Sequence, residues 1–513
     1  MYSERTMMKT LLVAALVCLL CAGCSGTREA LAAFEQDMAG GAYVNAAEAA
    51  EAKASKKDED ELMWRLLLGN ARSMGGESGE AIAQFDLAED IFSRNDKTST
   101  FSSALTGVHA MLTSENAFPY NGLGQERIFC CMYKALDYGV QSQFAAARTE
   151  LNRAADHQEN WLFERRKDIE ASEKLIRKEQ EEAAKKAAEE EAKAAKKAAE
   201  EEAKADKKKA DKKKADKKKK KDIDRDVNAV CADKGFAEAL KENADFDVAS
   251  SGNVEKLPEA AYSNAYLSHL CGVFRWLNGD GGRNFIRDAA RLNPNSRVLK
   301  EDLKAVSSGK PPAEDIWIYV EDGLCPYREE FRLDLPVGLL VWNDYIDYVG
   351  IALPRLIIRQ TGAATYTVTA SGKTQDFEHL ENIDRLLKTE FDVYLRGAIR
   401  REIMRCTIQL ASQAALGIAM NSTDNLWARI AIGIGKIAVT SWAVYHNEAD
   451  VRCWSTLPKR VLVQRVRRPA DGQLQIAAGI QTLSLEIPRG NSIVWIRKVA
   501  PGSPMVVKTM TFK

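Results

Sequence analysis

Apolar residues recur every three or four positions along the first part of the chain, from Glu29 to about Ala155. This spacing places apolar side chains on one side of a helix, so we expect helices that pack in pairs. The segment is rich in Ala, Glu and Leu, and Pro119 is its only proline, which favours helices further. We therefore expect a helical region over residues 24–164.

Three segments carry part of the tetratricopeptide pattern, in which small residues let two helices cross closely. Each match is incomplete, and Leu68 stands where the first segment should have glycine. Stacked helix pairs of this kind form curved surfaces that bind proteins or peptides, and helical hairpins without a repeat are the alternative. The matching residues are Trp64, Leu67, Ala71, Ala81, Phe85 and Ala88, then Ala135, Tyr138, Phe144, Ala147, Leu151 and Ala154, and finally Tyr266, Ala289, Leu292 and Pro294.

Between residues 165 and 221 the apolar stripe disappears and the sequence becomes low in complexity. Residues 181–191 read EEAAKKAAEEE and residues 192–202 read AKAAKKAAEEE. Glu repeatedly precedes Lys by four residues, which stabilises an isolated helix, so we expect a long charged single helix of about 85 Å. Its Lys-rich end, residues 204–221, is a candidate contact for peptidoglycan or anionic lipid, and a spacer without a partner is the alternative.

A further helical region over residues 222–309 is expected to continue the repeats, until Pro311 and Pro312 break the pattern. From Tyr327 to Leu335 apolar and charged residues alternate, which is the two-residue period of a half-buried strand. We expect residues 310–513 to form an α+β domain, a small β-sandwich or open barrel with helices inserted at about 377–445. The predicted strands cover residues 316–320, 327–335, 338–342, 365–370, 460–466, 483–487 and 493–499. The predicted fold class of the whole chain is α+β.

The N-terminal residues have the order of a bacterial secretory signal peptide. Positive charge at Arg5 and Lys9 precedes an apolar run over residues 11–20, which is too short to span a bilayer. Small residues Ala22 and Gly23 then stand before Cys24, where a signal peptidase requires them. Residues 1–23 are therefore expected to be a signal peptide.

The residues around Cys24 resemble a bacterial lipobox, in which the cysteine becomes the lipidated first residue. Cys21 stands where a lipobox usually has Leu, and an ordinary signal peptide or an uncleaved anchor is the alternative. We expect lipid on Cys24 to tether the chain to a membrane. By resemblance to enterobacterial sorting rules, Ser25 favours the outer membrane, facing the periplasm, over the inner membrane.

Composition narrows the possible functions. Hydrophobic residues make up 45% of the 513 residues, enough for a sizeable core, and the net charge of +0 gives no support for nucleic-acid binding. Cysteines that follow Cys24 are irregularly spaced and odd in number, and Cys231 with Cys271 is a candidate disulfide. These cysteines are Cys130, Cys131, Cys231, Cys271, Cys325, Cys406 and Cys453.

Motifs for catalysis or cofactor binding do not stand out. The histidines are scattered without metal-ligand spacing, and neither a metal nor a cofactor is expected. Ile432 to Lys436 has the wrong spacing for a phosphate loop, and the glycines there suit close helix contact. The apolar segment from Leu426 to Tyr445 is interpreted as a buried helical hairpin, with membrane insertion or oligomeric helix packing as the alternatives.

Several separated segments resemble a family of uncharacterised bacterial lipoproteins with tetratricopeptide-like N-terminal halves. Ala265 departs from that family, which tends to have proline there. The resemblance implies a cell-envelope role, because proteins of this family occur together with lipoproteins that activate peptidoglycan synthases. The matching residues are Tyr120, Gly122, Glu126, Arg127, Tyr133, Ala135, Leu136, Tyr138, Asn264, Tyr266, Leu267, Gly323, Pro326, Ala352, Leu353 and Pro354, together with Ala449, Asp450, Arg452, Trp454, Leu457 and Pro458.

These features favour a lipid-anchored, non-enzymatic envelope scaffold or adaptor that binds envelope proteins or cell wall. One alternative is an envelope hydrolase for peptidoglycan or lipid, with carboxylates such as Asp450. The other is a membrane-inserting secretion or assembly component that uses residues 426–445.

Overall fold

The computed structural model describes residues 25–102, 116, 118–163, 166, 262–309, 312–335, 349–359, 365–395, 397–399, 402, 405 and 448–512. Cys24 and the signal peptide lie outside these residues, as do the charged stretch apart from residue 166, Cys231, Cys406, the strand predicted at 338–342 and the apolar segment 426–445. Among the described residues, no helix is both long and apolar enough to cross a membrane.

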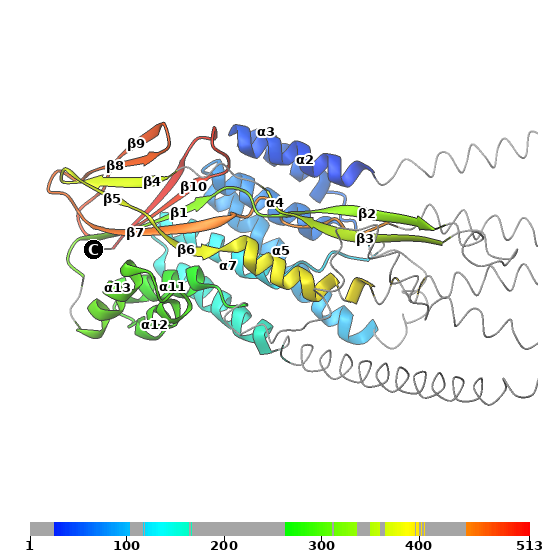
Figure 1. Cartoon of the computed structure of the whole chain (residues 1–513), viewed down its shortest axis with the longest axis horizontal. Coiled ribbons are helices and arrows are strands. Elements are labelled where there is room, and N and C mark those ends of the chain that lie inside the picture. The colour runs from blue at the N-terminus through cyan, green and yellow to red at the C-terminus, as the bar shows by residue number, and fades with distance from the viewer. Residues whose placement is uncertain are drawn as a thin grey trace, which may run out of the picture.

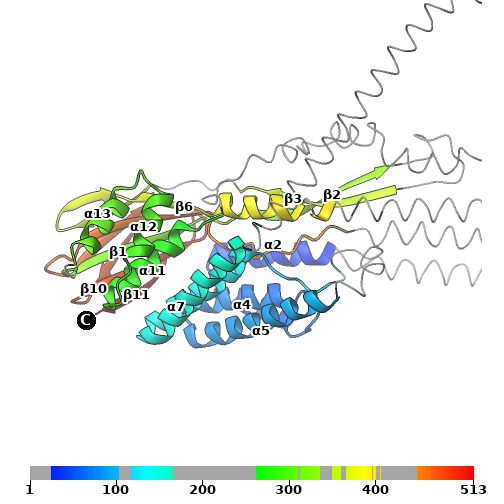
Figure 2. The same cartoon turned by 90° about the horizontal axis from the view of Figure 1, so that it is seen from below.

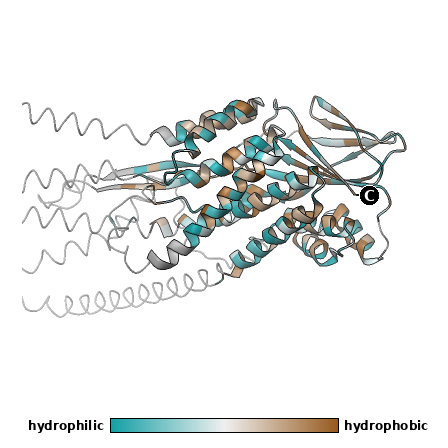
Figure 3. Cartoon of the chain, turned by 180° about the vertical axis from the view of Figure 1, so that it is seen from behind, coloured by the Kyte–Doolittle hydropathy of each residue, from teal (hydrophilic) through white to brown (hydrophobic). Residues whose placement is uncertain are grey.

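Helices form most of the first part of the described chain (Figure 1). Hydrophobic and hydrophilic residues occur along each ribbon, as expected for helices with one buried side (Figure 3). Side-chain caps begin two of them, because Asn264 and Ser296 accept hydrogen bonds from the N–H groups of Leu267 and Leu299. The helices are α2 (Ser25–Gly40), α3 (Tyr43–Ala54), α4 (Glu61–Met74), α5 (Ser78–Ser102), α7 (Gly124–Val140), α11 (Ala265–Leu277), α12 (Arg283–Leu292) and α13 (Arg297–Ser307), with residues 144–163 and 383–395 also helical.

The described strands form three sheets. Sheet A has the order β11-β10-β1-β7-β6, sheet B is the ribbon β2-β3, and sheet C has the order β5-β4-β8-β9. In sheet A, β1 pairs with β10 in parallel and with β7 antiparallel, so Ile318 lies beside both Val494 and Gln464. The strands are β1 (Asp315–Asp322), β2 (Tyr327–Leu335), β3 (Val349–Ile357), β4 (Tyr366–Ala370), β5 (Lys373–Asp376), β6 (Glu378–Asn382), β7 (Arg460–Arg467), β8 (Gln473–Ala478), β9 (Gln481–Glu486), β10 (Asn491–Lys498) and β11 (Val506–Phe512).

Sheet A is covered on both faces, which explains why every residue of β1 is buried. Trp317 and Tyr319 belong to a core that they share with the helices, from α2 to α13. Ile316 and Ile318, on the opposite face, belong to a second core that they share with β4 and β8 of sheet C. The described fold therefore has three layers, in the order helices, sheet A and sheet C. The ribbon β2-β3 extends away from sheet A beside α2 (Figure 1).

The α+β class predicted from the sequence is confirmed. The expected start of the inserted helices and the expected barrel are not confirmed. The inserted helices do not begin at residue 377, because Glu378–Asn382 forms β6 at the edge of sheet A and the helix starts at residue 383. The open barrel that was one alternative for residues 310–513 is not confirmed, because the described strands form three separate sheets.

Candidate functional site

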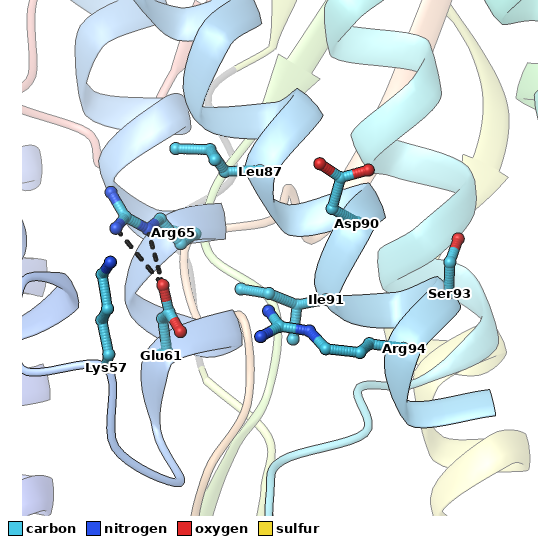
Figure 4. Close-up of a pocket in the computed structure, with 8 residues that line it drawn as sticks. All are labelled: Lys57, Glu61, Arg65, Leu87, Asp90, Ile91, Ser93 and Arg94. Atoms are coloured by element: carbon cyan, nitrogen blue, oxygen red, sulfur yellow. Dashed lines mark hydrogen bonds and ion pairs between the residues drawn. The ribbon is translucent and has the colours of Figure 1, made fainter. Parts of the chain in front are cut away.

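An accessible hollow lies on the outer side of the hairpin formed by α4 and α5, next to the loop before α4 (Figure 4). Its volume is about 510 Å³, and both helices contribute side chains that point into it. We call this hollow the hairpin pocket. Its lining residues are Lys57, Glu61, Arg65, Leu87, Asp90, Ile91, Ser93 and Arg94.

The hairpin pocket combines apolar contact area with charges of both signs. Leu87 is 42% exposed on α5, beside the buried Ile91. Arg65 is held in place, because its guanidinium donates to Glu61 at 3.3 Å and to Gln84 at 2.8 Å. Lys57 and Asp90 form no ion pair within the described part of the chain, so both charges are available to a ligand.

Sequence reasoning did not identify the hairpin pocket. Its residues come from a loop and two helices, and only the folded hairpin brings them together. One signal was present: Leu87 is an apolar residue between exposed Asp86 and Asp90 on the polar side of α5. An exposed leucine on a charged helix face is weak information alone, since single exposed apolar residues are common.

A charged cluster behind this hairpin has the residue types of a metal site. The ligand atoms of Glu89, Cys131 and Glu150 lie within 4.8 Å of one another. However, the ammonium group of Lys134 lies 2.9 Å from Glu89 and 3.2 Å from Glu150, and Arg153 lies 2.8 Å from Glu89. Two cations already neutralise the carboxylates, so the cluster is an ion-pair network between α5, α7 and residues 144–163.

His269, Asp302 and Tyr319 repeat the order of a nucleophile, base and acid relay. The Tyr319 hydroxyl lies 2.9 Å from His269 Nδ1, and His269 Nε2 lies 2.9 Å from Asp302. Asp302 also accepts hydrogen bonds from Trp317 at 3.0 Å and from Arg465 at 2.7 Å. Since His269, Asp302 and Tyr319 are each 0% exposed, a substrate has no access to them and they join α11 and α13 to sheet A.

Another buried network is centred on Glu321 in β1. Its carboxylate accepts hydrogen bonds from Tyr133 at 2.8 Å and Tyr266 at 3.1 Å, and lies 3.9 Å from the guanidinium of Arg497. Burial raises the pKa of Glu321, although Arg497 and the hydrogen bonds oppose that shift. The network joins α7, α11 and the centre of sheet A.

The segment 449–458 lies between the helices and sheet A. Arg452 donates to Asp450 at 2.8 Å and to the carbonyl of Phe118 at 2.9 Å, and lies 3.3 Å from Asp60. The Trp454 N–H donates to Glu126 at 2.7 Å. Asp450 is 7% exposed; burial would raise its pKa, but Arg452 and Arg328 lower it below the ordinary value. This segment therefore holds the fold together.

The described cysteines are buried free thiols. Burial raises the pKa of Cys271 to about 12, so this thiol stays protonated and unreactive at neutral pH. Its candidate disulfide partner, Cys231, lies outside the described residues, and so does Cys24, one position before α2 begins. The described cysteines are Cys130, Cys131, Cys271, Cys325 and Cys453.

No protein-family model matches the chain, and neither curated proteins nor solved structures give a match to it.

Proposed function

We propose that this protein is a non-enzymatic, lipid-anchored scaffold or adaptor of the cell envelope, tethered through Cys24 and facing the periplasm from the outer membrane. One observation carries the proposal. The polar clusters centred on His269, Glu321 and Arg452 are buried, whereas the hairpin pocket presents Leu87, Lys57 and Asp90 to solvent. An apolar contact flanked by available charges suits recognition of a protein segment better than bond chemistry.

The paired helices support this proposal. Hairpins α4–α5, α7 with residues 144–163, and α11–α12 coincide with the three segments that resemble tetratricopeptide repeats. Repeats of this type use exposed helix faces to bind peptides or proteins, an inference by analogy of fold. The hairpin pocket lies on such a face, on the first of the three hairpins.

We further propose that the charged stretch 165–221 is a long single helix whose Lys-rich end, residues 204–221, contacts peptidoglycan or anionic lipid. The support is the run of lysines, since each one near an anionic surface gains about 1 kcal/mol. The stretch lies between helix 144–163 and α11 in the sequence, so it would extend from the helical layer.

Site-specific photo-crosslinking in living cells tests the adaptor role. A photoreactive amino acid in place of Leu87 should give discrete adducts with envelope proteins. The same amino acid in place of Ser484, which is exposed on β9, is the matched control. Asp90→Arg should remove the Leu87 adducts and leave the control unchanged. Identical adducts at both positions, or Leu87 adducts that survive Asp90→Arg, would contradict the proposal.

The anchor has its own test. Cys24→Ser should abolish incorporation of labelled fatty acid and release the protein from sedimented membranes into the soluble fraction. Unchanged labelling in this variant would rule out Cys24 as the lipidated residue.

A further inference from the structure

Helix α2 connects the proposed lipid anchor directly to the folded core. It begins at Ser25, one residue after Cys24, so no linker separates the two. Its apolar side is fixed in the helical core, where Leu31, Phe34 and Met38 are 0%, 1% and 1% exposed. Phe34 also contacts Trp64 of α4 edge to face, with ring centres 6.4 Å apart.

Polar contacts hold the first turns of α2 as well. Arg28 donates to Glu35 at 3.0 Å and stacks on the ring of Tyr327 in β2, with its guanidinium 4.0 Å from the ring centre. Arg359, beyond the end of β3, lies 2.7 Å from Glu35 and covers the same ring at 4.8 Å. This cluster clamps the start of α2 to the ribbon β2-β3.

The hairpin pocket lies near the same point. The Thr27 hydroxyl lies 3.5 Å from the carboxylate of Asp60, the residue before α4, and the next residue, Glu61, lines the pocket. Three residues of fully extended chain span at most about 11 Å, so Thr27 stays within that distance of Cys24. The start of α2, the end of α5 and the far tips of β2-β3 all lie toward one end of the described fold in both views (Figures 1 and 2).

We propose that this end of the described fold faces the membrane that holds the lipid, in one fixed orientation. The inference rests on the proposed lipidation of Cys24. Acyl chains keep a lipidated residue at the bilayer surface, and α2 transmits that position to the core because it is clamped on two sides. Sheet C and α11–α13 then point away from the membrane (Figure 1). A partner that enters the hairpin pocket must present its binding segment close to the membrane surface.

Fluorescence quenching in vesicles tests the orientation with the full lipidated chain. Vesicles of phosphatidylethanolamine and phosphatidylglycerol would contain a lipid with a spin label on its headgroup. A fluorescent amino acid replaces either Lys57, at the pocket, or Ile480, which is 104% exposed in the turn between β8 and β9. Quenching at position 57 should exceed quenching at position 480 several-fold.

Matched controls separate the orientation from the anchoring. A flexible Gly-Ser linker inserted between Cys24 and Ser25 should keep the protein on floated vesicles but remove the difference between the two probes. Equal quenching at positions 57 and 480 in the parent chain, with flotation intact, would overturn the fixed orientation alone. Loss of flotation together with absence of the lipid in the intact mass would overturn the anchoring itself.

Discussion

Glu321 stands near the end of β1, between Val320 and Asp322, and its carboxylate is 0% exposed. Removing a carboxylate from water costs several kcal/mol unless hydrogen bonds and an opposite charge replace the water. Tyr133, Tyr266 and Arg497 provide that replacement, and each comes from a different element. At the residue scale, buried charges thus determine how helices are placed on sheet A.

Replacing Glu321 should therefore destabilise the fold, and the loss should depend on whether the new side chain can accept hydrogen bonds from the two tyrosines. Glu321→Ala leaves two buried hydroxyls without an acceptor and Arg497 without its counter-charge, which should lower the free energy of unfolding by about 3–5 kcal/mol. Glu321→Gln keeps a hydrogen-bond acceptor, so its loss in the free energy of unfolding should be clearly smaller than that of Glu321→Ala. Urea unfolding followed by circular dichroism would measure both, and equal losses would show that the hydrogen bonds contribute nothing.

Asp450 should make stability depend on pH at the acid end. Its folded pKa lies below the ordinary value of 3.8, so the ionised form stabilises the fold above that value. This contribution is lost as the pH falls from about 3.8 through the folded pKa. Asp450→Asn should therefore destabilise the protein most at pH 7, with a smaller difference from the parent chain near pH 3. A difference that stays constant between these pH values would contradict the assignment.

At the scale of elements, the α4–α5 hairpin shows how closely two helices approach. The repeat pattern predicts glycine directly after Leu67, but the chain has Leu68 there and glycine at position 69. A Cβ atom on Gly69 would lie 2.6 Å from the ring of Phe85 in α5. The small residue thus occurs where the helices cross, one position later than the pattern places it.

Gly69→Ala should destabilise the protein even though alanine is the better helix former by about 1 kcal/mol. The new methyl group must displace Phe85, whose ring packs against Trp454, and overpacking of this kind costs about 1–3 kcal/mol. Gly79, near the start of α5, has no atom within 4 Å of an added Cβ and is the matched control. Gly79→Ala should be neutral or stabilising in thermal unfolding. A stabilising Gly69→Ala would show that the helices do not cross there.

The strands predicted from the sequence correspond to β1, β2, β4, β7, β9 and β10, and β8 was missed although its apolar and polar residues alternate. Of the other strands that were missed, β3, β5 and β6 have physical reasons. β5 and β6 consist mainly of polar residues because they lie at sheet edges, where one side remains open to solvent. β3 contains Pro354, which lacks an amide proton and is tolerated because β3 pairs only with β2 among the described strands. Such strands are specified by their neighbours more than by their own residues.

At the scale of the whole molecule, the core does not follow the boundaries visible in the sequence. The change from helical to strand pattern near residue 310 suggests a domain limit, yet one hydrophobic core extends from α2 to β11. The hairpin pocket and the buried clusters could not be predicted, because their residues are far apart in the sequence. Some members of these clusters, among them Tyr133, Tyr266 and residues of segment 449–458, were matched to a family from the sequence, but the sequence did not show that they contact one another.

Because helices and sheet A share this core, the described fold should unfold as one unit, and Arg452 allows a test. Arg452 contacts Asp450 and, across the core, Asp60 and the carbonyls of Glu59 and Phe118. Arg452→Gln leaves the buried Asp450 without its nearest cation, which should lower the free energy of unfolding by about 3–5 kcal/mol. Helical circular dichroism and tryptophan fluorescence should then shift together to a lower melting temperature in a chain that starts at Ser25.

Arg72→Gln is the comparison for this variant, because Arg72 makes its ion pairs on the surface of α4, with a side chain 21% exposed. Exposed ion pairs contribute at most about 1 kcal/mol to stability. In Arg72→Gln the melting transitions seen by circular dichroism and by tryptophan fluorescence should therefore shift little and still coincide. A fluorescence transition that separates from the circular dichroism transition in Arg452→Gln would show two independent units. In that case the boundary near residue 310 would be a true domain limit, and segment 449–458 would join two domains that fold separately.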